Sequence, residues 1–584
     1  MRFKSGLADK YCIYAVAGTN SVSFAIDYTK ADTKGLLGFA VKRTYPGNKE
    51  YFMPGFKVFQ NEKKDPNAMV STEDHPIQSF VWDDFTLKPN ETYTYTFYAI
   101  KGKPGALVKG KPIVLKIKTE PAFSTNTHDI FFNRGIASSQ AYAREFNNTS
   151  PDKLAGKKQQ DAFDWLGRDL YPAMVKFVEQ AKKDETILAC FYEFNYLPFL
   201  KELKKAIDRG VNINLVIDGK MNGAAATAKT KAKGNTPRDG SLAAIKAAKI
   251  PMKNVVLRQA NKARLQHNKF MVYLQGKTQQ PVAVWTGSTN ITESGIFGQT
   301  NVGHWVRDNK TAALYQKYWT LLSKDPGGKD AADFKTYQQD VTNTQKGVTG
   351  DIPKGITPIF SPRATLDMLN QYFTLVDKAK SSSAITLAFG VTATLKDMLI
   401  KHSATSPICF MMLEKPDAPA PRSTKPFVAL GYQNNVYEAF GAFLQNPVYE
   451  WVRETNMKKL GITSFVNYIH SKFLIQDALG NDPIVITGSA NFSPPSTNSN
   501  DENMIMIRGD KRVADIYFTE FNRLFNHYYF RAVVQELANK KVKVDKKRYY
   551  LGEDDSWTLA YKSGSLRFKR VELFTNMAGA VTLK

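Results

Sequence analysis

The sequence predicts a multidomain protein in which an all-β sandwich is followed by a duplicated α/β body of mixed sheets flanked by helices. A chain of 584 residues is too long for a single hydrophobic core. Residues 1–120 alternate apolar and polar side chains in short runs between Gly, Pro and Asn turns, which is an all-β pattern. Beyond residue 121, strand-like apolar runs alternate with amphipathic helices, and this order occurs twice. We therefore expect a sandwich at 1–120, α/β halves at 121–345 and 346–538, and a basic, β-rich C-terminal extension at 539–584.

The expected sandwich contains one sharper pattern, the stretch Leu87–Ala99, in which L-x-P precedes tyrosines at alternate positions. This stretch resembles the tyrosine-corner strand of fibronectin type III domains, and the resemblance implies an immunoglobulin-like sandwich. Modules of this kind usually bind or pack and carry no chemistry. The pattern fits a domain that targets a substrate, and equally one that only supports the body that follows.

The two α/β halves begin with the same strand–helix–strand order. In the first half, the expected elements are a strand at 186–192, a helix at 197–209 and a strand at 211–218. In the second half, they are a strand at 384–389, a helix at 395–402 and a strand at 408–413. This duplication predicts a pseudo-two-fold pair with the functional site at its seam. A linker rich in Gly, Asp, Lys and Thr is expected between the halves at Lys324–Ile356.

A short motif, H-x-K followed about twenty residues later by G-S-x-N, occurs once in each half. The residues of the first copy are His267, Lys269, Ser288 and Asn290, and those of the second are His470, Lys472, Ser489 and Asn491. Residues i and i+2 of a strand point to one face, so each lysine lies beside its histidine. The glycine after the next strand permits a tight turn that exposes the Ser hydroxyl and the Asn amide to a ligand.

Two such half-sites together supply two imidazoles, two ammonium groups, two hydroxyls and two amides. This set suits a phosphodiester. The lysines would hold the non-bridging oxygens, one histidine would attack phosphorus, and the other would protonate the leaving group, with roles reversed in the second step.

The two motifs resemble the signature of the phospholipase D superfamily, H-x-K-x4-D followed by G-S-x-x-N or a close variant. The resemblance implies phosphodiester chemistry through a covalent phosphohistidine, without a metal or another cofactor. It adds Asp477 to the catalytic set, together with Glu502, which stands where the family has an acid that orients an active-site histidine. The resemblance does not say which of the two histidines is the nucleophile, although it favours the first.

The first copy departs from that signature. Leu274 stands in place of the aspartate, and Asn301 stands at the position that matches Glu502. Tyrosyl-DNA phosphodiesterases also lack the aspartate, so we expect an active site with unequal halves. On this reading His470 has the conventional acidic support, and His267 follows a dense basic segment.

The net charge of +26 predicts a polyanionic partner. Residues 220–264 contain eleven Lys or Arg against one acid, and within them 221–241 is expected to be a loop that either clamps a phosphate backbone or is a solvated insertion. Nucleic acid is therefore the favoured substrate. A phospholipase D or phosphatidyltransferase acting on anionic phospholipid surfaces is the second hypothesis, and a non-catalytic polyanion-binding relative is the third.

The remaining features predict a cytoplasmic, metal-free protein. No apolar run has the length of a transmembrane helix or the form of a signal peptide. The three cysteines lie in apolar runs, as buried reduced thiols do. The other histidines lack metal-ligand spacing, and no nucleotide-binding glycine loop occurs, so no cofactor is expected. Both half-sites lie in one chain, so a monomer is sufficient to complete the site.

Overall fold

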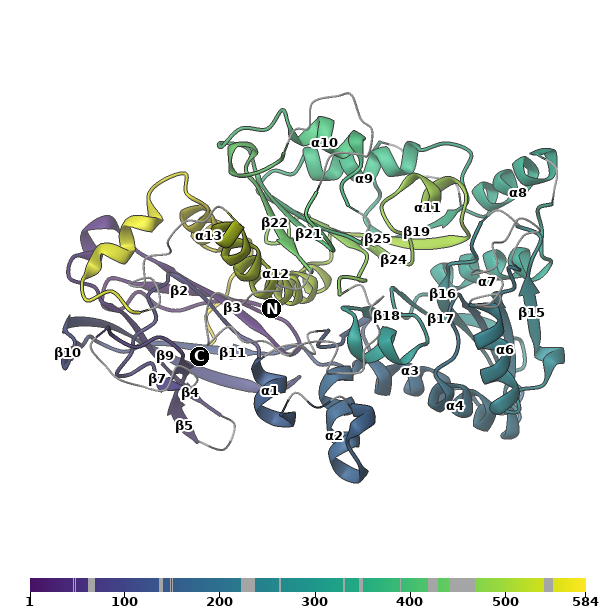
Figure 1. Cartoon of the computed structure of the whole chain (residues 1–584), viewed down its shortest axis with the longest axis horizontal. Helices are drawn as coiled ribbons and strands as arrows, with labels where there is room; N and C mark the ends of the chain where they lie inside the picture. The colour runs from purple at the N-terminus through teal and green to yellow at the C-terminus, as the bar shows by residue number, and fades with distance from the viewer. Residues whose placement is uncertain are drawn as a thin grey trace.

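The computed structural model places an N-terminal β-rich part beside two α/β halves (Figure 1). It describes residues 1–45, 47, 49–60, 69–135, 140–147, 149, 151–221, 237–261, 264–328, 331–345, 350–388, 390–417, 429–441, 468–539 and 550–583. The second half lies above the first in the view of Figure 1, and the N-terminal sheets lie to one side of both. This order of parts confirms the predicted fold class.

The N-terminal part is made of two antiparallel sheets. One has the order β1-β2-β3-β8, and the other has the order β10-β9-β4-β5 with β11 also paired to β9. The strands are β1 (Arg2–Lys4), β2 (Cys12–Ala17), β3 (Val22–Asp27), β4 (Gly38–Thr44), β5 (Glu50–Phe52), β8 (Val81–Asp84), β9 (Thr92–Lys103), β10 (Ala106–Lys109) and β11 (Ile113–Lys118), with a short pair β6 (Pro54–Gly55) and β7 (Val70–Ser71). Phe24 on β3 packs against Tyr95 and Phe97 on β9, so the two sheets share one apolar interior.

The predicted tyrosine corner is present as a contact. The backbone N–H of Lys88 donates to the hydroxyl oxygen of Tyr93 at 2.9 Å. This bond ties the entry of β9 to the segment upstream, which is how a tyrosine corner fixes the turn before its strand. The wider resemblance to fibronectin type III domains stays a prediction.

The first half is built on a seven-stranded sheet of order β12-β18-β17-β16-β13-β14-β15. Its strands are β12 (His128–Phe132), β13 (Thr186–Phe191), β14 (Asn212–Asp218), β15 (Val255–Arg258), β16 (Lys269–Gln275), β17 (Gln280–Gly287) and β18 (Val302–Val306). Its helices are α1 (Gln140–Phe146), α2 (Gly156–Gly167), α3 (Leu170–Glu179), α4 (Leu197–Asp208), α6 (Arg238–Ala247) and α7 (Asn309–Ser323). Strands β13, β14 and β15 run parallel, and the others are antiparallel.

The second half repeats this design, with the order β19-β25-β24-β23-β20-β21-β22. Its strands are β19 (Gly355–Ser361), β20 (Ser382–Leu387), β21 (Ile408–Leu413), β22 (Val436–Phe440), β23 (Phe473–Gln476), β24 (Ile484–Gly488) and β25 (Glu502–Arg508). Its helices are α9 (Asp367–Asp377), α10 (Ala393–Leu399), α11 (Pro494–Asn498) and α12 (Lys511–Asn539). The shared strand order confirms the duplication predicted from the sequence.

Two expectations about connections are wrong. The predicted linker at 324–356 contains helix α8 (Ala331–Thr344), in which Tyr337 and Val341 are buried four residues apart. The expected β-rich extension instead forms a 3₁₀ helix (Asp555–Tyr561) and helix α13 (Leu566–Thr575) in its described residues. Trp557 and Tyr561 are also four residues apart and both pack on Phe80. Spacing of four places residues on one face of an α-helix such as α8, where the polar composition concealed this period. In the second segment, the alternation from Trp557 to Tyr561 concealed the helix. The basic cluster at 540–548 lies outside the described residues.

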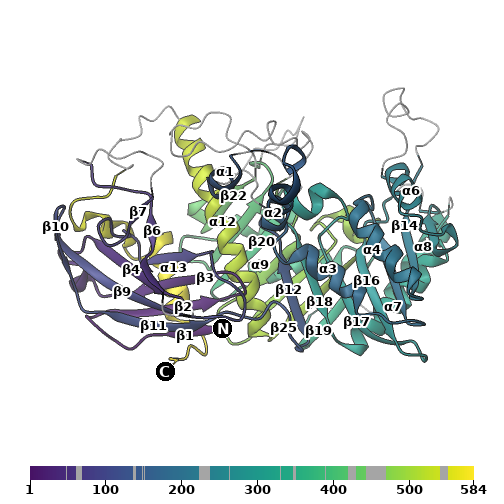
Figure 2. The same cartoon turned by 90° about the horizontal axis from the view of Figure 1, so that it is seen from below.

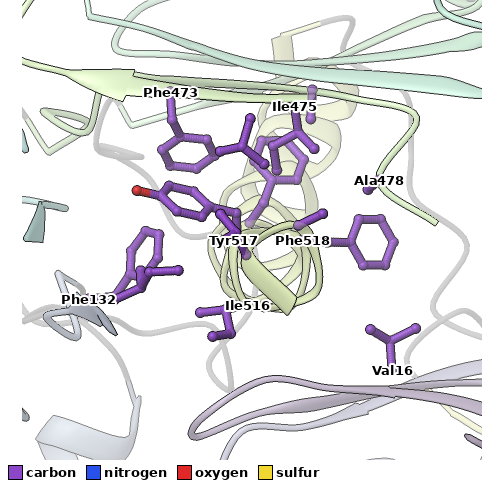
Figure 3. Close-up of a cluster of buried hydrophobic side chains, with 14 of the residues drawn as sticks. Val16, Phe132, Phe473, Ile475, Ala478, Ile516, Tyr517 and Phe518 are labelled. Atoms are coloured by element: carbon purple, nitrogen blue, oxygen red, sulfur yellow. The ribbon is translucent and has the colours of Figure 1, made fainter. Parts of the chain in front are cut away.

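Helix α12 runs between the N-terminal sheets and the α/β body (Figure 2). Its apolar residues meet three parts of the chain at once. Ile516, Tyr517 and Phe518 lie among Val16 of β2, Phe132 of β12 and Phe473 of β23 (Figure 3). The N-terminal sheets and both halves therefore share one continuous hydrophobic core.

Charged groups fix the same interface. Arg2 is only 5% exposed, and its Nε donates to Asp515 Oδ1 at 2.8 Å. The remaining N–H groups of its guanidinium donate to the carbonyls of Leu479, Gly480, Ala478 and Ala578. A buried arginine in which all three guanidinium nitrogens donate resists separation of the parts, because a lone buried charge is costly.

Candidate active site

Two short backbone bridges join the halves next to the motif histidines. Gln266 bridges Asp501, and Thr300 bridges Ile469. The backbone N–H of His267 also donates to the carbonyl of Asp501 at 2.9 Å. Since Gln266 and Ile469 each precede a motif histidine, each histidine lies against the start of a strand in the opposite half.

The acidic support of the site crosses this seam. Nδ1 of His267 lies 2.9 Å from both carboxylate oxygens of Glu502, which belongs to the second half. The hydroxyl of Ser489 donates to Glu502 Oε2 at 2.6 Å. The sequence reading that gave this acid to His470 is therefore wrong, because the seam bridge aligns β25 with the first histidine.

His470 has the side-chain amide of Asn301 at the position where His267 has the carboxylate of Glu502. Its Nδ1 donates to Asn301 Oδ1 at 2.9 Å, and the hydroxyl of Ser288 donates to the same oxygen at 2.8 Å. Asn301 Nδ2 donates to the carbonyl of Gly295 at 2.7 Å, which fixes the orientation of the amide. In both halves Nδ1 carries the proton, so Nε2 of each imidazole is left to face a substrate.

These contacts also correct the role predicted for the two serines. Ser288 and Ser489 are fully buried. Each hydroxyl donates a hydrogen bond to the residue that contacts the histidine of the other half, Asn301 or Glu502. These hydrogen bonds give the serines the task of positioning Asn301 and Glu502. The G-S pair thus completes the opposite half-site.

The lysines and asparagines remain the candidate phosphate ligands. Lys269 and Lys472 each donate to the backbone carbonyl of the histidine two residues earlier, which holds the ammonium beside its imidazole. Asn290 Nδ2 donates to Glu193 Oε2 at 2.6 Å. The Oδ1 atoms of Asn290 and Asn491 are buried and have no partner among the described residues. An amide oxygen only accepts hydrogen bonds, so phosphate oxygens would have to bind the Nδ2–H groups of these side chains.

A family model described as "Cardiolipin synthase, PLD-like domain" matches residues 174–322 and 375–525, which together make up more than half of the chain. The two matched ranges contain the two H-x-K motifs. The chain belongs to the phospholipase D superfamily. Members of this superfamily are phosphodiesterases and phosphotransferases, and the protein is an enzyme of this kind.

Three solved structures are similar to this chain. The phosphatidylserine synthase of Haemophilus influenzae is 12% identical, covers 65% of this chain and 92% of its own, and has a TM-score of 0.43. Nuc of Salmonella typhimurium is 24% identical over 26% of this chain and 87% of its own, with a TM-score of 0.20. A yeast tyrosyl-DNA phosphodiesterase variant is 11% identical over 59% and 89%, with a TM-score of 0.30. No curated protein sequence matches the chain. With TM-scores below 0.5, these likenesses carry no argument about fold or substrate.

Asp477 does not belong to this phospholipase D-like site, although the motif predicted a catalytic role for it. It follows β23 at the end away from His470, and its carboxylate accepts hydrogen bonds from the backbone N–H groups of Lys380, Ser381 and Ser382. These hydrogen bonds hold the start of β20 next to the end of β23, so the aspartate of the motif stabilises the sheet. Leu274, at the matching position in the first half, is the second-last residue of β16 and has no carboxylate to make such bonds.

Two acids that the sequence reading missed hold the histidine segments in place. Asp218 ends β14 and accepts from the backbone N–H of Gln266 at 2.9 Å, while Glu414 follows β21 and accepts from the N–H of Ile469 at 2.9 Å. Burial raises the pKa of Asp218 to about 6 and that of Glu414 to about 7. An acid at the end of the second parallel strand of each half was the available sequence signal.

Burial also influences the charge state of the motif histidines and lysines. It lowers the pKa of His267 to about 4, and Lys269 acts in the same direction while Glu502 opposes it. Burial, Lys472 and Lys269 hold the pKa of His470 well below its usual value. Burial lowers the pKa of Lys269 to about 8 and that of Lys472 well below its usual value. Burial therefore disfavours positive charge on these groups, and a bound anionic phosphodiester would favour it.

Part of the predicted basic segment has a structural role. Arg258 is 2% exposed, and its guanidinium binds Asp501 at 3.0 Å and Asp325 at 2.6 Å. Residues 222–236 of the expected loop lie outside the described residues. Among the residues that the structure does describe, no cluster of three His, Cys, Asp or Glu side chains could hold a metal, and no helix is both long and apolar enough to cross a membrane.

Proposed function

We propose that the protein cleaves phosphodiesters through a covalent phosphohistidine on His267, with His470 as the general acid and base. The pairing of Glu502 with His267 carries this proposal. When Nε2 attacks phosphorus, the ring becomes positive, and a buried carboxylate on Nδ1–H stabilises that charge directly. The neutral amide on His470 offers no such charge, so His470 releases its proton more readily to a leaving oxygen.

The reaction then runs in two balanced steps. When the anionic diester binds, its charge lets His470 take up a second proton, at Nε2. His267 Nε2 then forms a bond to phosphorus while the bond to the leaving oxygen breaks, and that oxygen takes the Nε2 proton of His470. Water next gives a proton to His470, bonds to phosphorus, and releases His267. Lys269 and Lys472, with the amides of Asn290 and Asn491, would hold the non-bridging oxygens and stabilise the added negative charge.

Trapping the intermediate tests this assignment. His470→Ala, supplied with a diester that has an activated p-nitrophenol leaving group, is expected to form a stable phosphoenzyme that peptide mapping places on His267. The bond should form in the presence of EDTA. Label found on another residue, or a strict requirement for a divalent metal, would overturn the proposal.

Nucleic acid is the substrate that the charge favours. A net charge of +26, with basic residues concentrated before His267, supplies phosphate contacts whose affinity depends on salt. An anionic phospholipid is the second candidate, because the matching domain is described as that of a cardiolipin synthase. The purified protein should be given single- and double-stranded DNA, RNA and anionic liposomes in parallel. Nucleic-acid cleavage is the expected result, and headgroup release alone would reverse the order.

A further inference from the structure

One carboxylate in the site is not used by the mechanism above. Glu193 follows β13 by two residues, is half-buried, and accepts the hydrogen bond from Asn290 described earlier. Burial lowers the pKa of both Lys269 and Lys472, and the negative charge of Glu193 opposes this lowering at both. Glu193 therefore acts electrostatically on the two ammonium groups that would hold the substrate.

The other acids of the site have fixed positioning tasks. Glu502 is bound to His267 and Ser489, while Asp218 and Glu414 each accept a backbone N–H before a histidine. Glu193 instead binds Asn290, which is itself a candidate phosphate ligand. Its charge is thus placed against the bound phosphate group and not against a histidine.

The second half has an apolar residue at the position equivalent to Glu193. Phe191 pairs with Ile217 just before Asp218, and Leu387 pairs with Leu413 just before Glu414, so these two strand ends are equivalent. Two residues further on, the first half has Glu193, and the second half has Phe389 in the sequence. The acid is an addition to one half and not a product of the duplication.

We infer that Glu193 makes the site selective for phosphodiesters over phosphomonoesters and speeds the release of a monoester product. This inference rests on the proposed function. A diester carries one negative charge, whereas a monoester carries close to two at pH 7 because its second pKa is about 6. Repulsion from a fixed charge grows with the charge of the ligand, so Glu193 penalises the monoester about twice as much as the diester. Without it, two ammonium groups would hold the hydrolysis product tightly.

Glu193→Gln tests the charge alone, because the Gln carbonyl oxygen still accepts from Asn290. At pH 7, below the pKa of about 8 of Lys269, titration calorimetry with phenyl phosphate should show roughly tenfold tighter binding than in the unchanged protein. Dimethyl phosphate should gain clearly less. Phenyl phosphate should also become a stronger inhibitor of bis(p-nitrophenyl) phosphate cleavage. Glu202→Gln is the matched control, since Glu202 pairs with Lys205 on helix α4 and its loss changes the net charge equally.

Two results would overturn the inference. One is unchanged or weaker phenyl phosphate binding in Glu193→Gln. The other is an equal gain for phenyl and dimethyl phosphate, which would mean that the residue only orients Asn290. The calorimetry needs no turnover, so a protein that shows the selective gain in binding but cleaves no diester would refute the proposed function and leave the role of Glu193 standing.

Discussion

The two halves of the body have the same strand order but surround their histidines differently. His267 has a buried carboxylate on Nδ1, and His470 has an amide in the equivalent place. The first half adds Tyr192, whose ring lies 4.9 Å from that of His267, where the second half has Ala388. Duplication thus supplies the scaffold and the paired imidazoles, and a few substitutions at equivalent positions give the two histidines separate tasks.

The largest effect is expected when the carboxylate that supports His267 is replaced by a neutral amide like the one that supports His470. Glu502→Gln leaves an acceptor for His267 but removes the charge that stabilises the positive ring, so we expect kcat to fall by about 10²–10³-fold. Phosphoenzyme formation, measured by rapid quench, should slow by the same factor. Asn301→Ala is the matched change in the other half.

Asn301→Ala should slow cleavage of diesters with poor leaving groups and leave p-nitrophenyl esters nearly unaffected, because those need little protonation. If Glu502→Gln showed the same dependence on the leaving group, the roles of the two histidines would have to be exchanged.

The charge of the motif lysines should make kcat/KM depend on pH. The Lys269 ammonium is charged below its pKa of about 8 and neutral above it, so kcat/KM should fall as the pH rises through about 8. A guanidinium stays charged throughout this range, so Lys269→Arg should remove the decline even at a lower overall rate. A decline that is unchanged in this variant would assign it to another group, with Lys472→Arg as the next test.

The smallest effect on chemistry is expected at Asp477. Asp477→Asn keeps one carbonyl oxygen but loses the charge that receives three backbone N–H groups, so the free energy of unfolding should fall by about 1–3 kcal/mol. Urea denaturation measures this loss. The kcat of the folded fraction should change less than threefold, and a loss of a hundredfold would return the aspartate to the catalytic set.

The sequence was sufficient for the local parts of this site. An H-x-K on a strand and a G-S-x-N after the next strand fix side-chain direction through the two-residue period, so the motif alone selects Lys269, Lys472 and the two asparagines as candidate phosphate ligands. The partner of His267 could not be found in this way. Glu502 lies 235 residues further along the chain, and only the docking of one sheet on the other brings it to the ring.

The two wrong positional assignments share a cause. Asp477 was assigned from the family motif and the serines from the turn after their strand, which are both local features of the sequence, but hydrogen bonds to backbone groups and to the other half decide where their oxygens point. The helical tail was misread because Trp557 to Tyr561 shows an alternation, while the contacts that count are those of residues four apart on Phe80.

The shared core around α12 changes how the N-terminal sheets should be regarded. Ile516, Tyr517 and Phe518 are covered on one side by these sheets and on another by the strand that follows His470. A chain cut at residue 120 would expose the apolar side of this helix to water and strip Asp515 of its arginine. The N-terminal sheets are therefore packed into the core of the α/β body and are not a loosely attached addition to it. They cover one side of helix α12, and the strand that follows His470 in the second half-site packs on another side of the same helix.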